Sequence, residues 1–120
     1  MHELSVTESI LNIASEYAQN SGASRVTAIN LVIGQLSSIV DDSVSFYWEL
    51  VAENSICQGA ALHFERIAAK LACQDCGMEY TIPERLTPCP RCSSFNTRVV
   101  SGEEFYVESI EIEKEVIKST

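Results

Sequence analysis

The stretch CQDCGMEYTIPERLTPCPRC, residues 73–92, contains four of the chain's five cysteines. Cys73 and Cys76 form one Cys-x-x-Cys pair, Cys89 and Cys92 form a second, and twelve residues separate the two pairs. Two thiolates separated by two residues can bind one ion from a single tight turn, and two such turns complete the tetrahedral sulfur set that zinc favours. The sequence therefore predicts a zinc site with these four cysteines as ligands.

Other uses of the cysteine pairs are two disulfides in a secreted module, a redox-active pair, or a rubredoxin-like iron site. The chain opens without a signal-peptide pattern and has no apolar run of membrane-spanning length, so we expect a cytoplasmic protein with reduced cysteines. A catalytic Cys-x-x-Cys usually stands alone at a helix start. Gly77 and Ser93, the small residues after each pair, favour metal, because they let backbone amides turn toward the sulfurs.

The composition is acidic, with 17 acidic against 8 basic residues and a formal net charge of −9. Such a chain is poorly suited to binding nucleic-acid phosphates as its main activity. No Ser/His/Asp set, glycine-rich phosphate loop or paired-acid motif predicts an enzyme. A zinc-ribbon adaptor for proteins or nucleic acids remains the alternative function.

Hydrophobic periodicity predicts an α+β fold. Apolar positions Leu4, Leu11, Ala14 and Ala18, flanked by Ile10, Ile13 and Tyr17, predict a helix over residues 4–20. The sequence Ser5-Val6-Thr7-Glu8 reads as a capping box that would start this helix later and leave the first residues free. A second helix is predicted after Asp41, Asp42 and Ser43, which offer N-cap oxygens; its apolar stripe is Val44, Tyr47, Trp48, Val51 and Ala52.

Three strands are predicted, over residues 26–33, 61–72 and 104–113. The first is apolar on both parities apart from Asn30, as in a buried strand. The last changes parity between Val107 and Ile110, which indicates a bulge or packing on both sides. We expect a three-stranded sheet with two helices on it, formed by residues 1–70 and 103–120, and a small four-cysteine zinc-ribbon domain, residues 71–102, inserted before the last strand. The ribbon is too small for a core of its own, so zinc should supply most of its folding free energy.

Several single residues are interpreted structurally. Alternation places His63 on the opposite face from Leu62 and Phe64, toward solvent or a partner. Cys57 is interpreted as a small buried residue and not as a nucleophile. The run Phe46–Trp48 is interpreted as core.

The opening Met1-His2-Glu3 can chelate a metal. The Met1 amine, the His2 backbone nitrogen and the His2 imidazole can form adjacent rings around one divalent ion. Metals that displace amide protons favour square-planar nitrogen ligands, which indicates Ni(II) or Cu(II) and not Zn(II). By itself this is a weak signal, because many proteins begin Met-His.

Three features occur together and in order: the opening MHELS (residues 1–5), VIGQLS (residues 32–37) and the spaced cysteine pairs. With them the chain resembles the hydrogenase nickel-incorporation family HypA/HybF over nearly its full length. The resemblance implies a nickel metallochaperone with a zinc ribbon that works with the GTPase HypB. It would deliver Ni(II) to the [NiFe]-hydrogenase large-subunit precursor, without binding nucleic acid or membrane.

By the same resemblance the metal ligands fall on identifiable residues. Nickel would be held by His2 through its imidazole and backbone nitrogen, with the Met1 amine and the Glu3 backbone nitrogen as companions. Zinc would be held by the four cysteines of residues 73–92 as a structural ion. Left open are the nickel coordination number and any role of the Glu3 carboxylate. Also open are whether the zinc site senses nickel status, whether hydrogenase or urease is served, and whether the protein is a monomer or a domain-swapped dimer.

Overall fold

The computed structural model describes residues 2–82 and 86–114 and has the predicted α+β fold. Backbone packing divides the chain into two compact units. The first, here the α/β unit, comprises residues 1–31, 39–64 and 107–120, and the second, here the ribbon unit, comprises residues 32–38 and 65–106. The predicted ribbon, residues 71–102, falls inside the second unit.

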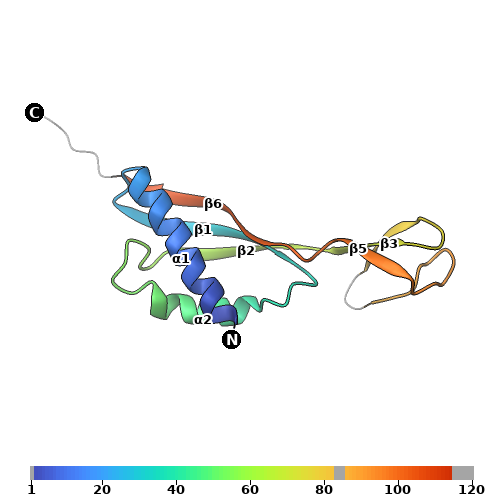
Figure 1. Ribbon diagram of the computed structural model, residues 1–120. Helices are drawn as coiled ribbons and strands as arrows, with labels where there is room; N and C mark the ends of the chain where they lie inside the picture. Colours follow the sequence, from blue (N-terminus) through green and yellow to red (C-terminus); the bar gives the residue numbers. More distant parts are fainter. Residues whose placement is uncertain (1, 83–85, 115–120) are drawn as a thin grey trace, which may run out of the picture. The chain divides into compact units, whose positions relative to one another are not determined.

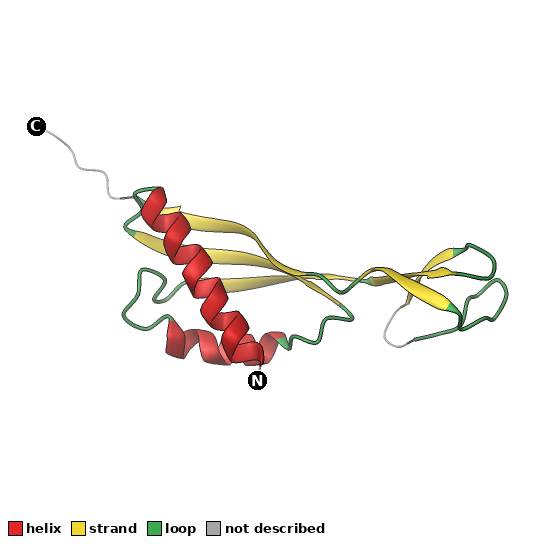
Figure 2. Ribbon diagram, in the orientation of Figure 1, coloured by secondary structure: helices red, strands yellow, loops and turns green. Residues whose placement is uncertain are grey.

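The predicted three-stranded sheet is present, with strand order β2-β1-β6, and two helices accompany it (Figures 1 and 2). β1 is buried along nearly all its length, as its apolar sequence predicts, because it is the central strand and pairs on both edges. Along β6 the half-buried positions change parity between Val107 and Ile110, as the sequence predicts. The elements are α1 (His2–Asn20), β1 (Arg25–Gly34), α2 (Asp41–Val51), β2 (Ala61–Ile67) and β6 (Phe105–Glu113).

α1 begins earlier than the capping-box interpretation allows. The helix starts at His2 and Ser5 lies within it, so the prediction that the first residues are free of the helix is wrong. Thr7 is buried, and its hydroxyl donates to the Glu3 carbonyl oxygen at 2.5 Å, the bond that a mid-helix threonine makes. Of the predicted apolar positions, Ala14 and Ala18 are buried, whereas Leu4 and Leu11 are only half-buried. Of the flanking residues, Ile10 is buried, and Ile13 and Tyr17 are about half exposed.

α2 is capped differently from the prediction. Its N-cap residue is Val40, which makes no side-chain cap hydrogen bond, while Asp41 and Asp42 lie in the first turn, where negative charge suits the helix dipole. Val44 and Trp48 are buried, and the Trp48 indole N–H donates to the Ala60 carbonyl at 3.0 Å. Phe46 is 66% exposed, so its assignment to the core was wrong.

The ribbon unit contains a second three-stranded sheet, of order β4-β3-β5. Its strands are β3 (Ala69–Cys73), β4 (Glu79–Ile82) and β5 (Thr97–Ser101), and both pairings are antiparallel. The strand predicted over residues 61–72 is thus two strands, β2 and β3, interrupted at Ala68.

The VIGQLS segment lies at a close backbone crossing within the ribbon unit. A Cβ on Gly34 would lie 2.1 Å from the Gly102 carbonyl oxygen, and one on Gly102 would lie 2.6 Å from the Ala69 Cα. Gln35 fastens the same crossing, because its side-chain oxygen accepts a hydrogen bond from the Ala69 amide at 2.8 Å. Glycine at position 34 is therefore required by contact between backbones.

Candidate metal centre

The two Cys-x-x-Cys pairs fold into equivalent turns. In the first, the Gly77 amide donates to the Cys73 carbonyl at 2.8 Å; in the second, the Ser93 amide donates to the Cys89 carbonyl at 2.7 Å. The residue after each pair has a positive φ, +80° at Gly77 and +63° at Ser93. The small residues recognised in the sequence therefore occupy the positions where each turn reverses the chain.

All four cysteine sulfurs converge. Their Sγ atoms lie within 4.8 Å of one another, with 3.5 Å between Cys73 and Cys92 and 3.5 Å between Cys76 and Cys89. A disulfide needs about 2.05 Å, whereas sulfurs around a tetrahedral zinc lie about 3.8 Å apart for Zn–S bonds of about 2.3 Å. All five cysteines lie in the described part of the chain, and none is in a disulfide. The donor set and its spacing fit one structural Zn²⁺.

Backbone amides point at the sulfurs and tune their acidity. The Cys76 amide is the main cause that lowers the pKa of Cys73. At Cys89, burial raises the pKa, but the Cys92 and Arg91 amides, together with hydrogen bonds from the Cys76 and Cys92 thiols, outweigh it and lower the pKa to about 7. The Ser94 amide lowers the pKa of Cys92, but the neighbouring thiols and burial together raise it to about 12. Four thiols this close cannot all ionise unaided, and a divalent cation would remove that repulsion.

A polar network joins the two turns, and it was not predicted from the sequence. The Asp75 carboxylate, inside the first pair, accepts hydrogen bonds from the Ser94 hydroxyl and from the Asn96 side-chain amide, the latter at 3.1 Å. These bonds lower the pKa of Asp75. The Gln74 amide also donates to the Asn96 carbonyl at 2.8 Å. The sequence did contain a signal for this network. An acidic residue lies within the first Cys-x-x-Cys pair, and short side chains that can form hydrogen bonds follow the second pair.

Two of the four metal ligands are also core residues of the ribbon. Cys73 and Cys89 are buried in one apolar cluster with Leu71, Tyr80 and Ile82. The Tyr80 hydroxyl donates to the Thr87 carbonyl at 2.9 Å, which holds the chain leading to the second pair. The hairpin of β3 and β4 presents the first pair, because Cys73 ends β3 and its amide donates to the Met78 carbonyl.

The predicted nickel residues are described only in part. Met1 lies outside the described residues, as does the side chain of His2, whose backbone begins α1. Glu3 is half-buried in the first turn of the helix. The nickel ligand set therefore stays a prediction.

Two further candidates, His63 and Cys57, lie as the sequence predicts. His63 is exposed on β2 while Leu62 and Phe64 are half-buried, as alternation predicts. Cys57 is fully buried, its sulfur lies 3.8 Å from the Ser15 hydroxyl, and burial raises its pKa, so it is an inert core thiol.

The sequence matches a known protein family along most of its length. The family model described as "Hydrogenase/urease nickel incorporation, metallochaperone, hypA" matches residues 1–112. The chain belongs to the HypA family. The hydrogenase maturation factor HypA of Dehalococcoides mccartyi strain CBDB1 is 42% identical over 115 residues, covering 96% of this chain and 97% of that protein. That of Geotalea uraniireducens is 41% identical over 113 residues, covering 94% and 100%.

Two solved HypA structures have the same fold. The solution structure of the Ni metallochaperone HypA from Helicobacter pylori matches with a TM-score of 0.66 at 27% identity, covering 94% of this chain and 98% of that chain. A second solution structure of a HypA protein gives a TM-score of 0.71 at 28% identity, covering 96% and 98%. The family recognised from three short motifs is therefore confirmed, together with its fold.

A search of the described helices for a membrane-spanning segment found none that is both long and apolar enough.

Proposed function

We propose that this HypA-family chain is a nickel carrier that binds Ni(II) at its N-terminus and delivers it during maturation of [NiFe]-hydrogenase. The observation that supports this most is the family match over residues 1–112, which includes both the opening MHELS and the cysteine pairs. The zinc ion has a separate, structural role, because four cysteines close its tetrahedron and leave no open position for exchange.

The nickel ligands are the Met1 amine, the His2 backbone nitrogen and imidazole, and the Glu3 backbone nitrogen. Ni(II) favours such planar nitrogen sets more than Zn(II) does. The start of α1 is compatible with this use. The His2 amide is the first of α1, and the amides of a helix's first turn have no intrahelical acceptor, so metal binding there breaks no helical hydrogen bond.

A terminal chelate suits delivery. Metal bound at the end of a chain can pass to an acceptor without unfolding a buried cage, whereas two of the four ribbon cysteines, Cys73 and Cys89, are buried in an apolar cluster. The acceptor is the large-subunit precursor of the hydrogenase, and the GTPase HypB is the partner. Any GTP hydrolysis belongs to that partner, because the sequence holds no phosphate-binding loop of its own. The carrier acts in the cytoplasm and is not an enzyme.

The two histidines of the chain provide a matched test. We expect His2→Ala to abolish specific nickel binding in tag-free protein that keeps Met1, with zinc content and fold unchanged. His63→Ala removes the exposed imidazole of β2 and should leave nickel binding unaltered. Calorimetry and near-UV/visible spectra of Ni(II) titrations measure both variants. Equal nickel affinity in wild type and His2→Ala would refute the N-terminal site.

Two further measurements probe the chelate. Nickel affinity should fall as pH drops below neutral, because the amine and the imidazole must lose protons to bind and protons then compete with the metal. A Gly-Ser extension before Met1 should weaken nickel binding about as severely as His2→Ala, because it moves the free amine out of position. Undiminished binding by the extended protein would exclude the amine as a ligand.

A further inference from the structure

One face of α2 combines exposed apolar side chains with exposed acidic side chains. Phe46 and Leu50, four residues apart, are 66% and 60% exposed. Asp42, Glu49 and Glu53 are exposed beside them, the last in the turn that follows the helix. These five residues are called the α2 patch. Side chains at such spacings lie on one side of a helix, so the patch is a continuous apolar and acidic surface.

Two of the three acids of the patch, Glu49 and Glu53, lie at the C-terminal end of α2, where negative charge is unfavourable. Glu49 is in the last turn of α2, where the helix dipole disfavours negative charge, and that turn holds no basic residue. Glu49 and Glu53 are four residues apart, a spacing at which like charges repel. The sequence from Val26 to Phe64 contains no Lys or Arg. Glu49 and Glu53 are therefore better explained by a cation from outside this segment than by the stability of α2.

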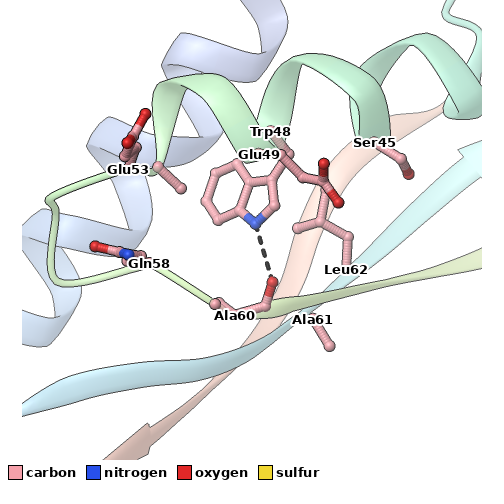
Figure 3. A pocket seen from close by; sticks show the side chains of 10 residues that line it. Ser45, Trp48, Glu49, Glu53, Gln58, Ala60, Ala61 and Leu62 are labelled. Carbon is pink, nitrogen blue, oxygen red and sulfur yellow. Dashed lines mark hydrogen bonds between the residues drawn. The ribbon is translucent and has the colours of Figure 1, made fainter.

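A hollow of about 300 Å³ adjoins the patch (Figure 3). Glu49, Glu53 and Gln58 line it with polar groups, and Trp48 and Ala52 line it with apolar surface. In Figure 3 the Trp48 indole stands between the two glutamates and its N–H points to the Ala60 carbonyl. A Lys or Arg side chain fits this chemistry, because its aliphatic stem can lie on the apolar wall while its charged head meets the carboxylates.

We propose that the α2 patch is the docking surface for a basic amphipathic helix of a partner protein. Phe46 and Leu50 would pack against the apolar face of that helix, and its Lys or Arg side chains would meet the three acids. Nucleic acid and anionic membrane are repelled by the same charges. A second copy of this chain is disfavoured, because a two-fold contact would place the acids of one patch against those of the other.

The test is selection of 16-residue peptides from a displayed random library on zinc-loaded, nickel-free protein. Enriched peptides should carry paired apolar residues and Lys or Arg, and should bind more weakly as salt rises. The chain's single tryptophan, Trp48, lines the hollow and reports binding by fluorescence. We expect Phe46→Ser/Leu50→Ser and Glu49→Gln/Glu53→Gln each to weaken binding by about tenfold or more. Glu8→Gln/Glu16→Gln, which removes the same charge from the exposed side of α1, should change it less than about twofold.

Four outcomes would overturn the proposal. They are no enrichment, enrichment of peptides without basic residues, equal binding by wild type and both patch variants, and a wild-type dimer that Phe46→Ser/Leu50→Ser converts to a monomer. Light scattering of the free proteins decides the last. The inference does not depend on where nickel binds. Peptide binding by His2→Ala protein therefore separates a failure of docking from a failure of the proposed nickel site.

Discussion

The two units of this chain differ in the composition of their cores. In the α/β unit the fully buried side chains include Val26, Ile29, Leu31 and Val44, from strand and helix, and its one cysteine, Cys57, is buried as another small apolar group. In the ribbon unit the apolar cluster is smaller, and metal ligands are members of it. Loss of the metal therefore frees side chains that form part of the core of the ribbon unit, and it changes nothing in the core of the α/β unit.

The largest expected effect separates the units. Cys89→Ser should abolish zinc binding and unfold the ribbon, because a three-cysteine site leaves the remaining thiolates without their full metal tetrahedron and disrupts the apolar cluster. The α/β unit should keep its fold. Zinc content and amide NMR signals of residues 65–106 report the ribbon, and Trp48 emission reports the α/β unit.

Cys57→Ser is the matched control. It places a hydroxyl at a fully buried site in the α/β unit, so it should lower that unit's stability and leave zinc content at one ion per chain. Loss of zinc from Cys57→Ser, or an unchanged ribbon spectrum in Cys89→Ser, would contradict the division.

Ile29→Ala tests whether damage to the core of the α/β unit leaves the ribbon unit intact. Ile29 is fully buried on the central strand of the α/β unit, and its truncation should lower that unit's free energy of unfolding by about 2–5 kcal/mol through lost burial and a cavity. Denaturant titration followed by Trp48 fluorescence measures the loss. Zinc retention against a chelator should not change, and zinc released in step with Trp48 unfolding would show that the units are not independent.

Periodicity carried most of the fold prediction, because it reflects which faces are buried. The apolar run of β1 and the stripe of α2 were both assigned from it. The ends and caps of the helices were predicted less well. Ser5 fits a capping box, but α1 continues through it, since local hydrogen-bonding preference is weaker than a longer amphipathic helix whose buried face includes Thr7.

The candidate metal centre was also predicted from the sequence only in part. The spacing of the four cysteines predicted the sulfur cluster, since short turns fix where their side chains point. The Asp75 network could not be read from the sequence, because its partners become neighbours only when both turns fold around one centre. Phe46 was assigned to the core from composition, although its position on α2 places it outside the buried stripe. The nickel ligands rest on family resemblance and stay a prediction.

Asp75→Ala should weaken zinc binding without abolishing it. The substitution removes the acceptor for Ser94 and Asn96, and so loosens one turn against the other while all four ligands remain. We expect zinc affinity to fall about fivefold in a chelator competition, the effect of roughly one hydrogen bond.

Two further variants distinguish the network from general charge. Asp75→Asn/Asn96→Asp exchanges acceptor and donor and should recover part of the affinity that Asp75→Ala loses. Glu79→Gln removes an exposed acid from the same unit, beside Lys70, and should have no effect on zinc. Equal affinities in Asp75→Ala and Glu79→Gln would show that the network does not hold the turns together.

The smallest expected effects come from substitutions that compare the two Cys-x-x-Cys turns. Gly77 and Ser93 occupy equivalent left-handed positions, and a Cβ at Gly77 would meet nothing within 4 Å, so Gly77→Ala tests backbone conformation alone. It should cost about 1 kcal/mol. Ser93→Gly removes that same strain from the second turn, but it also frees the unfolded chain, so its net gain should be smaller, about 0.5 kcal/mol. Because zinc binding and ribbon folding are coupled, chelator competition measures both: affinity should fall for Gly77→Ala and rise slightly for Ser93→Gly. Weaker zinc binding by Ser93→Gly would show that the Ser93 side chain contributes a contact that outweighs its backbone strain.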